Sequence, residues 1–363
     1  MIETSARRFV GNKSALSPAQ TLRALADAVP AGAEPDFYGA GALIEELEAQ
    51  VAALLGKEAA VFAPSGRVAQ LCALRVHADR RARTLIATHP RSHIVEDESD
   101  AISALYGLRV ARVGSLVEPF TCADLAAVHE PLAAVVVELP LRRAGYRVPD
   151  WDELTAIAAQ ARAAGAALHL DGARLWETAP GYGRSAAEIA AIADTVYVSF
   201  YKGLGALAGA ALASDAVTIA AARRWIARAG VTLARMYPYV LGAREGLRVE
   251  LPRMSAYHAH AVALARALST VDGVAVSPAP PVCNAFVVHL EGEHGALLAA
   301  RDAVTERCGL VVFERLARTA HPGVCSFELV VGSNTLALGI DEVRQGLSQI
   351  VRDASALSPQ TRH

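Results

Sequence analysis

The chain has 363 residues, a length that exceeds one small core and predicts about two domains. Hydrophobic residues make up 53% of the chain and charged residues 20%, so the composition excludes a disordered or collagen-like protein. The 35 Lys and Arg residues nearly balance the 37 Asp and Glu residues, for a net charge of -2. We therefore expect neither nucleic acid nor an anionic membrane as a partner.

Strand and helix patterns alternate over the first two thirds of the chain. Continuous runs rich in Val, Leu and Ile predict strands that are buried on both faces, as in a parallel sheet, at 59–63, 84–88, 109–113, 133–138, 166–170 and 195–200. Helical patterns lie between or beside them, at 43–56, 67–81, 98–106, 123–128, 152–165 and 186–193. Asp150 and Ser185 stand at N-cap positions, and Gly56 at a helix C-terminus. The series predicts an α/β fold with a large, mostly parallel sheet flanked by helices.

The last third predicts a smaller α/β domain. A long helix is expected over 214–229, after which Pro238 and Pro252 interrupt the pattern. The remaining elements are helices at 255–268, 296–308 and 341–353, a strand at 285–290, and a strand pair near 310–313 and 326–331. We expect an N-terminal arm over 1–35, a large domain over 36–247 and a small C-terminal domain over 248–363.

The five cysteines are odd in number and scattered, with no CxxC pair. This usage is typical of reduced thiols in a cytoplasmic enzyme, and it favours neither a disulfide framework nor a zinc site, so no metal is expected. The first ten residues lack the apolar segment of a secretory signal, and the apolar runs elsewhere are too short to span a bilayer. We expect a soluble, cytoplasmic protein.

Two strand ends carry the residues with the clearest chemistry. Asp171 ends a buried strand, where α/β sheets bind ligands, and it could hold a proton on a pyridine nitrogen or simply cap a turn. Lys202 follows the next strand among small residues and is either a Schiff-base lysine with a lowered pKa or a lysine that extends to solvent. A strand followed by Asp and then a strand followed by Lys indicates a functional site more specifically than either residue alone.

With these two segments, HLDGAR (169–174) and SFYKGLG (199–205), the sequence resembles the threonine aldolase and β-eliminating lyase family of pyridoxal-phosphate (PLP) enzymes. The resemblance implies the aspartate-aminotransferase-like fold, PLP fold type I, in which the large, mostly parallel sheet is of the seven-stranded type. It implies that Lys202 forms the internal aldimine, with Ser199 in the same cofactor segment, and that Asp171 pairs with the pyridinium nitrogen. Arg174 would bind a substrate carboxylate or the cofactor phosphate.

Three further segments resemble family positions. APSGRVAQ (63–70) is similar to the phosphate loop before a helix, which implies that Ser65, Gly66 and Arg67 bind the cofactor phosphate. SHIVEDE (92–98) implies that His93 stacks on the cofactor ring and that Glu98 supports it. The DFYG segment (36–39) implies that Tyr38 lies near the substrate, although each of these segments could also be an ordinary turn, loop or interface.

The sequence departs from the family after 135–138, where Glu-Asn-Thr-His is expected. Here Glu138 precedes Leu-Pro-Leu-Arg-Arg, so the family histidine is absent, and Arg142 or Arg143 could replace a carboxylate-binding arginine or form a solvated turn. The usual C-terminal arginine also has no clear match, and Glu328 stands in that region. These departures leave the cofactor site intact and make the reaction the open question.

The resemblance implies an amino-acid lyase, and we favour aldol cleavage of a threonine-like β-hydroxy-α-amino acid to glycine and an aldehyde. The alternatives are β-elimination from a β-substituted amino acid, for which Lys202 could serve as the base, and a non-catalytic PLP-binding protein. An NAD-dependent dehydrogenase is disfavoured because no GxGxxG opens a helix after a strand. The family's sites form at a subunit interface, which implies a homodimer or homotetramer.

Overall fold

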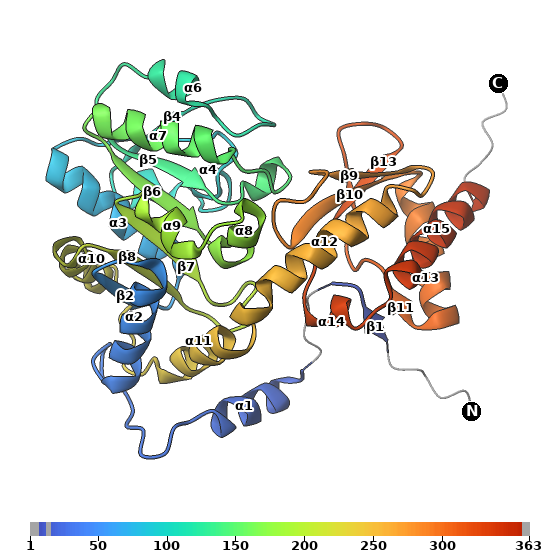
Figure 1. Cartoon of the computed structure of the whole chain (residues 1–363), viewed down its shortest axis with the longest axis horizontal. Coiled ribbons are helices and arrows are strands. Elements are labelled where there is room, and N and C mark those ends of the chain that lie inside the picture. Colours follow the sequence, from blue (N-terminus) through green and yellow to red (C-terminus); the bar gives the residue numbers. More distant parts are fainter. Residues whose placement is uncertain (1–6, 12–15, 358–363) are drawn as a thin grey trace. The chain divides into compact units, whose positions relative to one another are not determined.

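The computed structural model describes residues 7–11 and 16–357, which divide into two compact units. One unit is Leu16–Arg253, and the other joins residues 7–11 to the segment from Met254 to Leu357 (Figure 1). Each unit has its own sheet and its own buried side chains. The domain limits at 35 and 247 that the sequence suggested stay a prediction.

A seven-stranded sheet forms the centre of the Leu16–Arg253 unit, in the order β2-β8-β7-β6-β5-β3-β4 (Figure 1). Its strands are β2 (Ala59–Ala63), β3 (Leu85–Thr88), β4 (Arg109–Arg112), β5 (Leu132–Glu138), β6 (Ala167–Gly172), β7 (Thr195–Ser199) and β8 (Ala210–Ser214). Neighbours pair in parallel except around β8, which runs antiparallel to both β2 and β7. The predicted α/β fold with a mostly parallel sheet is confirmed.

Helices flank this sheet and provide the crossovers that parallel strands require. They are α1 (Pro18–Asp27), α2 (Ala42–Leu55), α3 (Gly66–Arg81), α4 (His93–Glu96), α5 (Ala101–Ala104), α6 (Cys122–Ala126), α7 (Trp151–Ala163), α8 (Leu175–Tyr182), α9 (Ala186–Ala191), α10 (Ala216–Arg228) and α11 (Tyr237–Val249). Asp150 and Ser185 cap α7 and α9 as predicted, and Gly56 ends α2 in the left-handed conformation. A buried hydrophobic core joins α3 and α10 to the strands.

Two expectations about these helices were wrong. The helix expected at 98–106 is reduced to α5 because Ser99 and Asp100 both adopt positive φ angles, which no helix continues through. Pro238 does not interrupt the pattern; it lies in the first turn of α11, where a proline needs no amide hydrogen. The start of α11 is also capped by the buried carboxylate of Asp36, which accepts from the amides of Met236 and Tyr237 at 2.8 to 2.9 Å.

The second unit contains a four-stranded sheet in the order β12-β13-β10-β9, in which all pairs are antiparallel. The short helix η2 (Leu251–Arg253) ends the larger unit. The elements of the smaller unit between residues 254 and 357 include α12 (Met254–Leu268), β9 (Val274–Ser277), β10 (Ala285–Glu291), α13 (His294–Cys308), β12 (Ala317–Arg318), β13 (Val324–Val330), α14 (Ser333–Leu336) and α15 (Ile340–Leu357). The expected strand pair was wrong: β11 (Leu310–Val311) pairs in parallel with β1 (Arg8–Phe9), while β13 pairs with β10. A partner 300 residues away leaves no local signal in the sequence.

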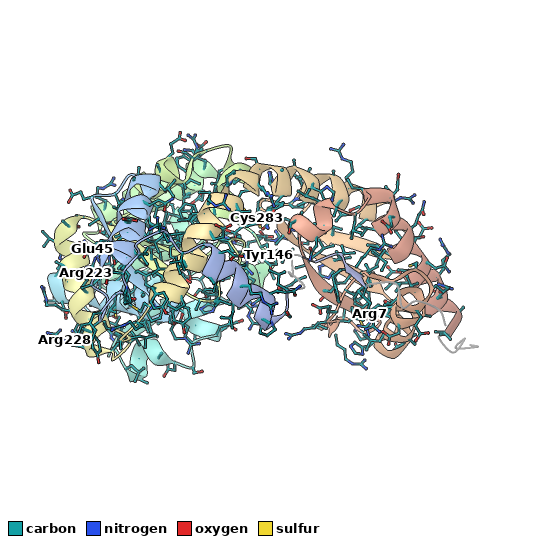
Figure 2. All side chains as sticks on the ribbon, turned by 90° about the horizontal axis from the view of Figure 1, so that it is seen from below. Arg7, Glu45, Tyr146, Arg223, Arg228 and Cys283 are labelled. Atoms are coloured by element: carbon teal, nitrogen blue, oxygen red, sulfur yellow. The ribbon has the colours of Figure 1, made fainter. Side chains whose placement is uncertain are left out.

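Side chains fill the space between the ribbons of each unit (Figure 2). Within the larger unit, Arg223 of α10 forms an ion pair with Glu48 of α2, and Glu48 also accepts from the amide of Phe62 in β2 at 2.7 Å. Because Glu48 is buried, removing the arginine would leave an uncompensated charge. This pair therefore ties two helices and an edge strand together.

A chain of buried polar side chains lies at the opposite end of the sheet from the strand ends that carry Asp171 and Lys202. Arg81 donates to Nδ1 of His77 at 3.4 Å, so the ring hydrogen of His77 is on Nε2 and points to Thr195 Oγ1 at 2.9 Å. The Thr195 hydroxyl then donates to Nδ1 of His169 at 2.8 Å. Burial lowers the pKa of His77 and of His169 to about 3, so both rings are neutral in the folded protein.

These two histidines predict a loss of stability in acid. Below the unfolded pKa of 6.5 the unfolded chain takes up protons that the folded chain refuses until about pH 3, so the free energy of unfolding falls as pH falls through this window. At pH 5 each histidine should cost about 2 kcal/mol, from about 1.4 kcal/mol per pKa unit. Urea unfolding between pH 7 and 5 should show this slope. The fall in the free energy of unfolding should be smaller in His169→Gln than in the wild-type protein. It should equal the wild-type value in His129→Gln, the control variant at an exposed position.

Candidate active site

Three neighbouring strands of the sheet end at one edge, and their last residues form the centre of the candidate site. β5 ends at Glu138, which is paired with Asp171 of β6, and Asp171 is paired in turn with Tyr197 of β7. Because these strands are parallel, their carboxyl ends meet at the same edge. Residues 138, 171 and 199, far apart in the sequence, are therefore brought together by the sheet.

Lys202 lies in the connection between β7 and β8, and this connection contains no helix. Because β8 reverses direction, a short link suffices, and the amide of Phe200 bonds to the carbonyl of Gly209 at 3.1 Å across its base. The amide of Gly205, at positive φ, bonds to the carbonyl of Lys202 at 3.1 Å and closes a turn. Lys202 is thus held next to the strand end that bears Asp171.

The surroundings of Lys202 favour its neutral amine. Burial, followed by the positive charge of Arg174, lowers the pKa of Lys202 from 10.5 to about 8, against the opposing influence of Asp171, Glu138 and Glu177. The ammonium of Lys202 also lies 5.9 Å from the ring centroid of Tyr201. A lysine with a lowered pKa at a ligand-binding edge is a candidate nucleophile and base.

Asp171 is 2% exposed and lies within a tightly held turn. One carboxylate oxygen of Asp171 accepts from the amide of Ala173 at 3.2 Å. The hydroxyl of Ser199 donates to the carbonyl of Ala173 at 2.7 Å. A β-carbon at Gly172 would collide with the carbonyl of Tyr197, so the close approach of β6 and β7 requires glycine there. Ser199 therefore fixes the Asp171 turn, whatever else its oxygen binds.

His93 begins the short helix α4, and two carboxylates hold it. Its Nδ1 lies 3.0 Å from an oxygen of Glu98, and its main-chain amide donates to Glu138 at 2.7 Å. The second oxygen of Glu138 accepts from the amide of Arg142 at 3.2 Å. The hydrogen bond to Glu98 raises the pKa of His93, while burial raises the pKa of Glu98. Burial, with the nearby charge of Asp171, raises the pKa of Glu138 to about 7.

The N-terminus of α3 presents main-chain amides that no side chain caps within the described part of the chain. Ser65 is its N-cap, and Gly66 packs so closely against Tyr197 that a β-carbon would collide with the tyrosine hydroxyl. Arg67 is exposed, and its guanidinium donates to the carbonyl of Asp97 at 2.8 Å. The N-terminus of this 16-residue helix can bind an anion through its main-chain amides and the helix dipole.

The remaining predicted residues lie on loops of the same unit. Tyr38 is 57% exposed at positive φ, with its ring in edge contact with Phe37. The guanidinium of Arg174 lies 5.4 Å from the ring centroid of Tyr146. Arg143 is exposed in the turn before Gly145 and forms an ion pair with the carboxylate of Asp97, at 3.0 Å through Nε, so a carboxylate-binding role for it stays a prediction.

Sequence reasoning missed Glu177, which lies in the first turn of α8, three residues after Arg174. It is 2% exposed, and one of its oxygens accepts from the amide of Gly203 at 2.8 Å. A glutamate within the largely apolar, buried segment 175–179 was the available signal, because a buried carboxylate needs partners. Its partner lies 26 residues away and could not be read from the pattern.

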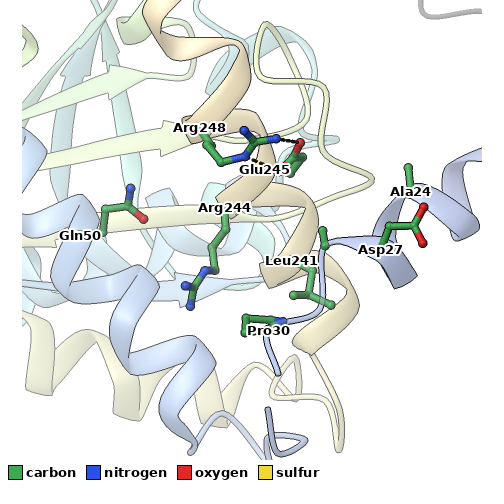
Figure 3. A pocket seen from close by; sticks show the side chains of 9 residues that line it. Ala24, Asp27, Pro30, Gln50, Leu241, Arg244, Glu245 and Arg248 are labelled. Carbon is green, nitrogen blue, oxygen red and sulfur yellow. Dashed lines mark hydrogen bonds and ion pairs between the residues drawn. The ribbon is translucent and has the colours of Figure 1, made fainter. Parts of the chain in front are cut away.

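A pocket of about 570 Å³ lies elsewhere in the same unit, between α1, α2 and α11 (Figure 3). Its lining includes Gln50, Arg244, Glu245 and Arg248, and Arg248 is paired with Glu245 at 2.6 Å. None of the candidate site residues lines this pocket, so it is separate from the site around Lys202. Among the described residues no helix combines the length and apolar character needed to cross a membrane, and no group of three metal-binding side chains is found.

Known proteins share the fold and part of the sequence of this chain. A family model described as beta-eliminating lyase matches residues 15–291. A solved structure described as a putative L-allo-threonine aldolase from Listeria monocytogenes is 34% identical to this chain, with a TM-score of 0.90 and 96% of both chains covered. A second, described as a putative aromatic amino acid beta-eliminating lyase/threonine aldolase from Exiguobacterium sp., is also 34% identical. Its TM-score is 0.91, and the match covers 96% of this chain and 98% of that chain.

Two curated relatives extend the comparison. Low-specificity L-threonine aldolase 1 of Arabidopsis thaliana is 27% identical over 279 residues, which are 74% of this chain and 76% of that protein. Aldolase vrtJ of Penicillium aethiopicum is 35% identical over 187 residues, and this match spans only 50% of this chain and 47% of the relative.

Proposed function

Because the chain belongs to the beta-eliminating lyase family, we propose that it is a PLP-dependent lyase that cleaves β-hydroxy-α-amino acids to glycine and an aldehyde. The observation that carries this proposal is the pair of residues at adjacent strand ends, buried Asp171 and Lys202 with its lowered pKa. A binding protein without chemistry needs neither. When bound, PLP supplies an electron sink that weakens the bonds at the substrate Cα.

The residues at the strand ends fit such a cofactor. Lys202 supplies an amine for covalent attachment, and Asp171 supplies a buried carboxylate for a protonated ring nitrogen. The amides at the start of α3, with Ser65, Gly66 and Arg67 around them, suit a phosphate. Buried oxygens of Gln70 and Glu98 have no hydrogen-bond partner among the described residues, as expected where a polar ligand belongs.

Substrate and proton handling are assigned to residues on the surrounding loops. When Glu98 is ionised and the His93 ring is neutral, the ring hydrogen is on Nδ1, which leaves Nε2 with a lone pair that can take the proton of a β-hydroxyl group. The ring of His93 would also stack on the cofactor. Arg174 is proposed to bind the substrate carboxylate, with Arg142 as a second candidate and Tyr38 beside the substrate.

Product analysis tests the reaction. Threonine and phenylserine should yield glycine and the matching aldehyde, and His93→Ala should lower the rate by roughly 10²–10⁴, the usual contribution of a general base. The competing reaction is β-elimination, which the lowered pKa of Lys202 favours because a neutral amine can remove the Cα proton. Serine-like or cysteine-like substrates would then give a 2-oxo acid and ammonia. Formation of the 2-oxo acid without any glycine would refute the aldolase proposal.

We also propose that the enzyme is a homodimer or homotetramer. Helix α1 has no buried residue in the described chain, and Leu22 on it is 63% exposed. Phe37, Tyr38 and Leu207, all at least 50% exposed, add apolar surface on loops of the same unit. A helix whose apolar side stays exposed is typical of an association site.

Sedimentation of the purified protein should therefore give a mass of at least two chains. Leu22→Asp should shift the equilibrium toward the monomer, because a charge on the apolar side of α1 would be desolvated in an interface. Leu105→Asp, at a side chain that is 77% exposed, serves as the matched control and should leave the mass unchanged. A monomeric wild-type protein would contradict the proposal.

The cytoplasmic location also stays a proposal, based on the dispersed cysteines.

A further inference from the structure

Glu177 is connected to the peptide group of the lysine itself. Its carboxylate accepts the amide hydrogen of Gly203, and this amide is the nitrogen of the peptide bond that follows Lys202. A β-carbon at position 203 would collide with the same carboxylate oxygen, so the contact requires glycine there. The carboxylate and the lysine loop are thus fitted to each other through a hydrogen bond and a close steric contact.

The other oxygen of Glu177 is buried and has no hydrogen-bond partner among the described residues. Leaving a carboxylate oxygen in this state is costly unless nearby positive charge compensates. Burial raises the pKa of Glu177, and the charges of Arg174 and Lys202 oppose this rise. The positive charges of Arg174 and Lys202, which the proposed reaction uses, therefore help to compensate the buried carboxylate, together with main-chain amides.

From this geometry we infer that Glu177 is a positioning residue for Lys202: it fixes the lysine through the Gly203 amide and holds a negative charge beside its amine. The inference rests on the proposed function for the role of Lys202 in the reaction. The contact with Gly203 and the charge are properties of the chain itself, so they can be measured without turnover.

The experiment uses competitive acylation of the full-length chain after its cofactor has been removed with hydroxylamine, read by mass spectrometry as a function of pH. The chain has three lysines, at positions 13, 57 and 202, so the reactivity of each can be followed separately. The labelling midpoint reports the charge around each amine, and the plateau rate at high pH reports how accessible the amine is. Lys57, whose ammonium donates to the carbonyl of Ala193 at 2.6 Å, is the internal standard.

Two substitutions separate charge from position. Glu177→Gln keeps an oxygen for the Gly203 amide and removes the charge, so the midpoint of Lys202 should fall by about one pH unit, equivalent to about tenfold more free amine below the midpoint. Its plateau rate should stay the same. Glu177→Leu also removes the acceptor, so the plateau rate should rise at least about threefold as the loop is released. Glu188→Gln, at an exposed position on α9, should change neither quantity.

The outcomes keep the two proposals apart. An unchanged Lys202 midpoint in Glu177→Gln together with an unchanged plateau in Glu177→Leu, both in protein with a wild-type near-ultraviolet circular dichroism spectrum, would overturn the role of Glu177. If Glu177→Leu does not fold, the isosteric Gln variant still decides the question of charge. Failure of the wild-type chain to bind PLP at Lys202 would instead refute the proposed function, and the labelling results for Glu177 would stand.

Discussion

Lys202→Ala should abolish turnover, with a loss of at least about a thousandfold, because general acid–base steps alone contribute roughly 10²–10⁴. The same side chain is proposed to attach the cofactor and to move the proton at Cα, so one substitution removes both functions. The near-visible absorbance of the bound cofactor should disappear as well. The burial that lowers the pKa of this amine to about 8 is what makes it reactive near neutral pH.

Borohydride reduction followed by peptide mapping locates the attachment directly. The pyridoxyl mass should appear on Lys202 of the wild-type chain and on none of the other lysines. Lys57→Ala is the matched control, since it removes another half-buried lysine of the same unit and should keep both label and turnover. A label on Lys13 or Lys57, or full activity in Lys202→Ala, would refute the assignment.

Asp171→Asn should lower turnover by about 10²–10³, the range measured when one preorganised electrostatic contact is lost. The carboxylate is buried, so its charge acts in a low-dielectric environment where it is strong. An amide of the same shape can still accept from Ala173, and the amides at the start of α3 are untouched, so the cofactor should remain bound. The rate should therefore fall far more than the cofactor occupancy.

A carboxylate that contacts the opposite end of β6, from the residue before β7, provides the comparison. Asp194 accepts from the amide of Leu168 at 2.8 Å, near the start of β6, and Asp194→Asn should leave turnover within a few-fold of wild type. Occupancy is read from the absorbance and turnover from the release of glycine. Equal turnover in Asp171→Asn at full occupancy would show that Asp171 does not act on the cofactor ring.

The parallel sheet could be predicted because β2, β3, β5 and β7 are nearly continuous apolar runs, which is typical of strands buried on both faces. Strand β8 was missed because AALAS carries no β-branched residue, and its place between β2 and β7 follows from tertiary pairing. Helix α11 was missed because proline ends helices and also begins them, and the sequence alone does not say which.

The central residues of the candidate site could be predicted for a different reason. Asp171 lies at the carboxyl end of β6 and Lys202 comes three residues after the end of the neighbouring β7, so the geometry of the sheet brings them together. The supporting contacts of Glu138 and Glu177 could not be predicted, because each carboxylate reaches a main-chain amide on another loop, 45 and 26 residues away. Main-chain amides are present at almost every position, so no residue type marks them.

The pairing of β1 with β11 makes the smaller unit discontinuous in sequence, and this has a consequence for biosynthesis. Arg8 meets its neighbours about 300 residues later, so at about 5–20 residues per second the early segment waits roughly 15–60 s for its partner to be translated. The whole stretch from Leu16 to Arg253, with all seven strands of its sheet, is made within that interval. The nascent chain can thus complete its larger unit first, while residues 8 and 9 remain an unpaired edge that chaperones would have to shield.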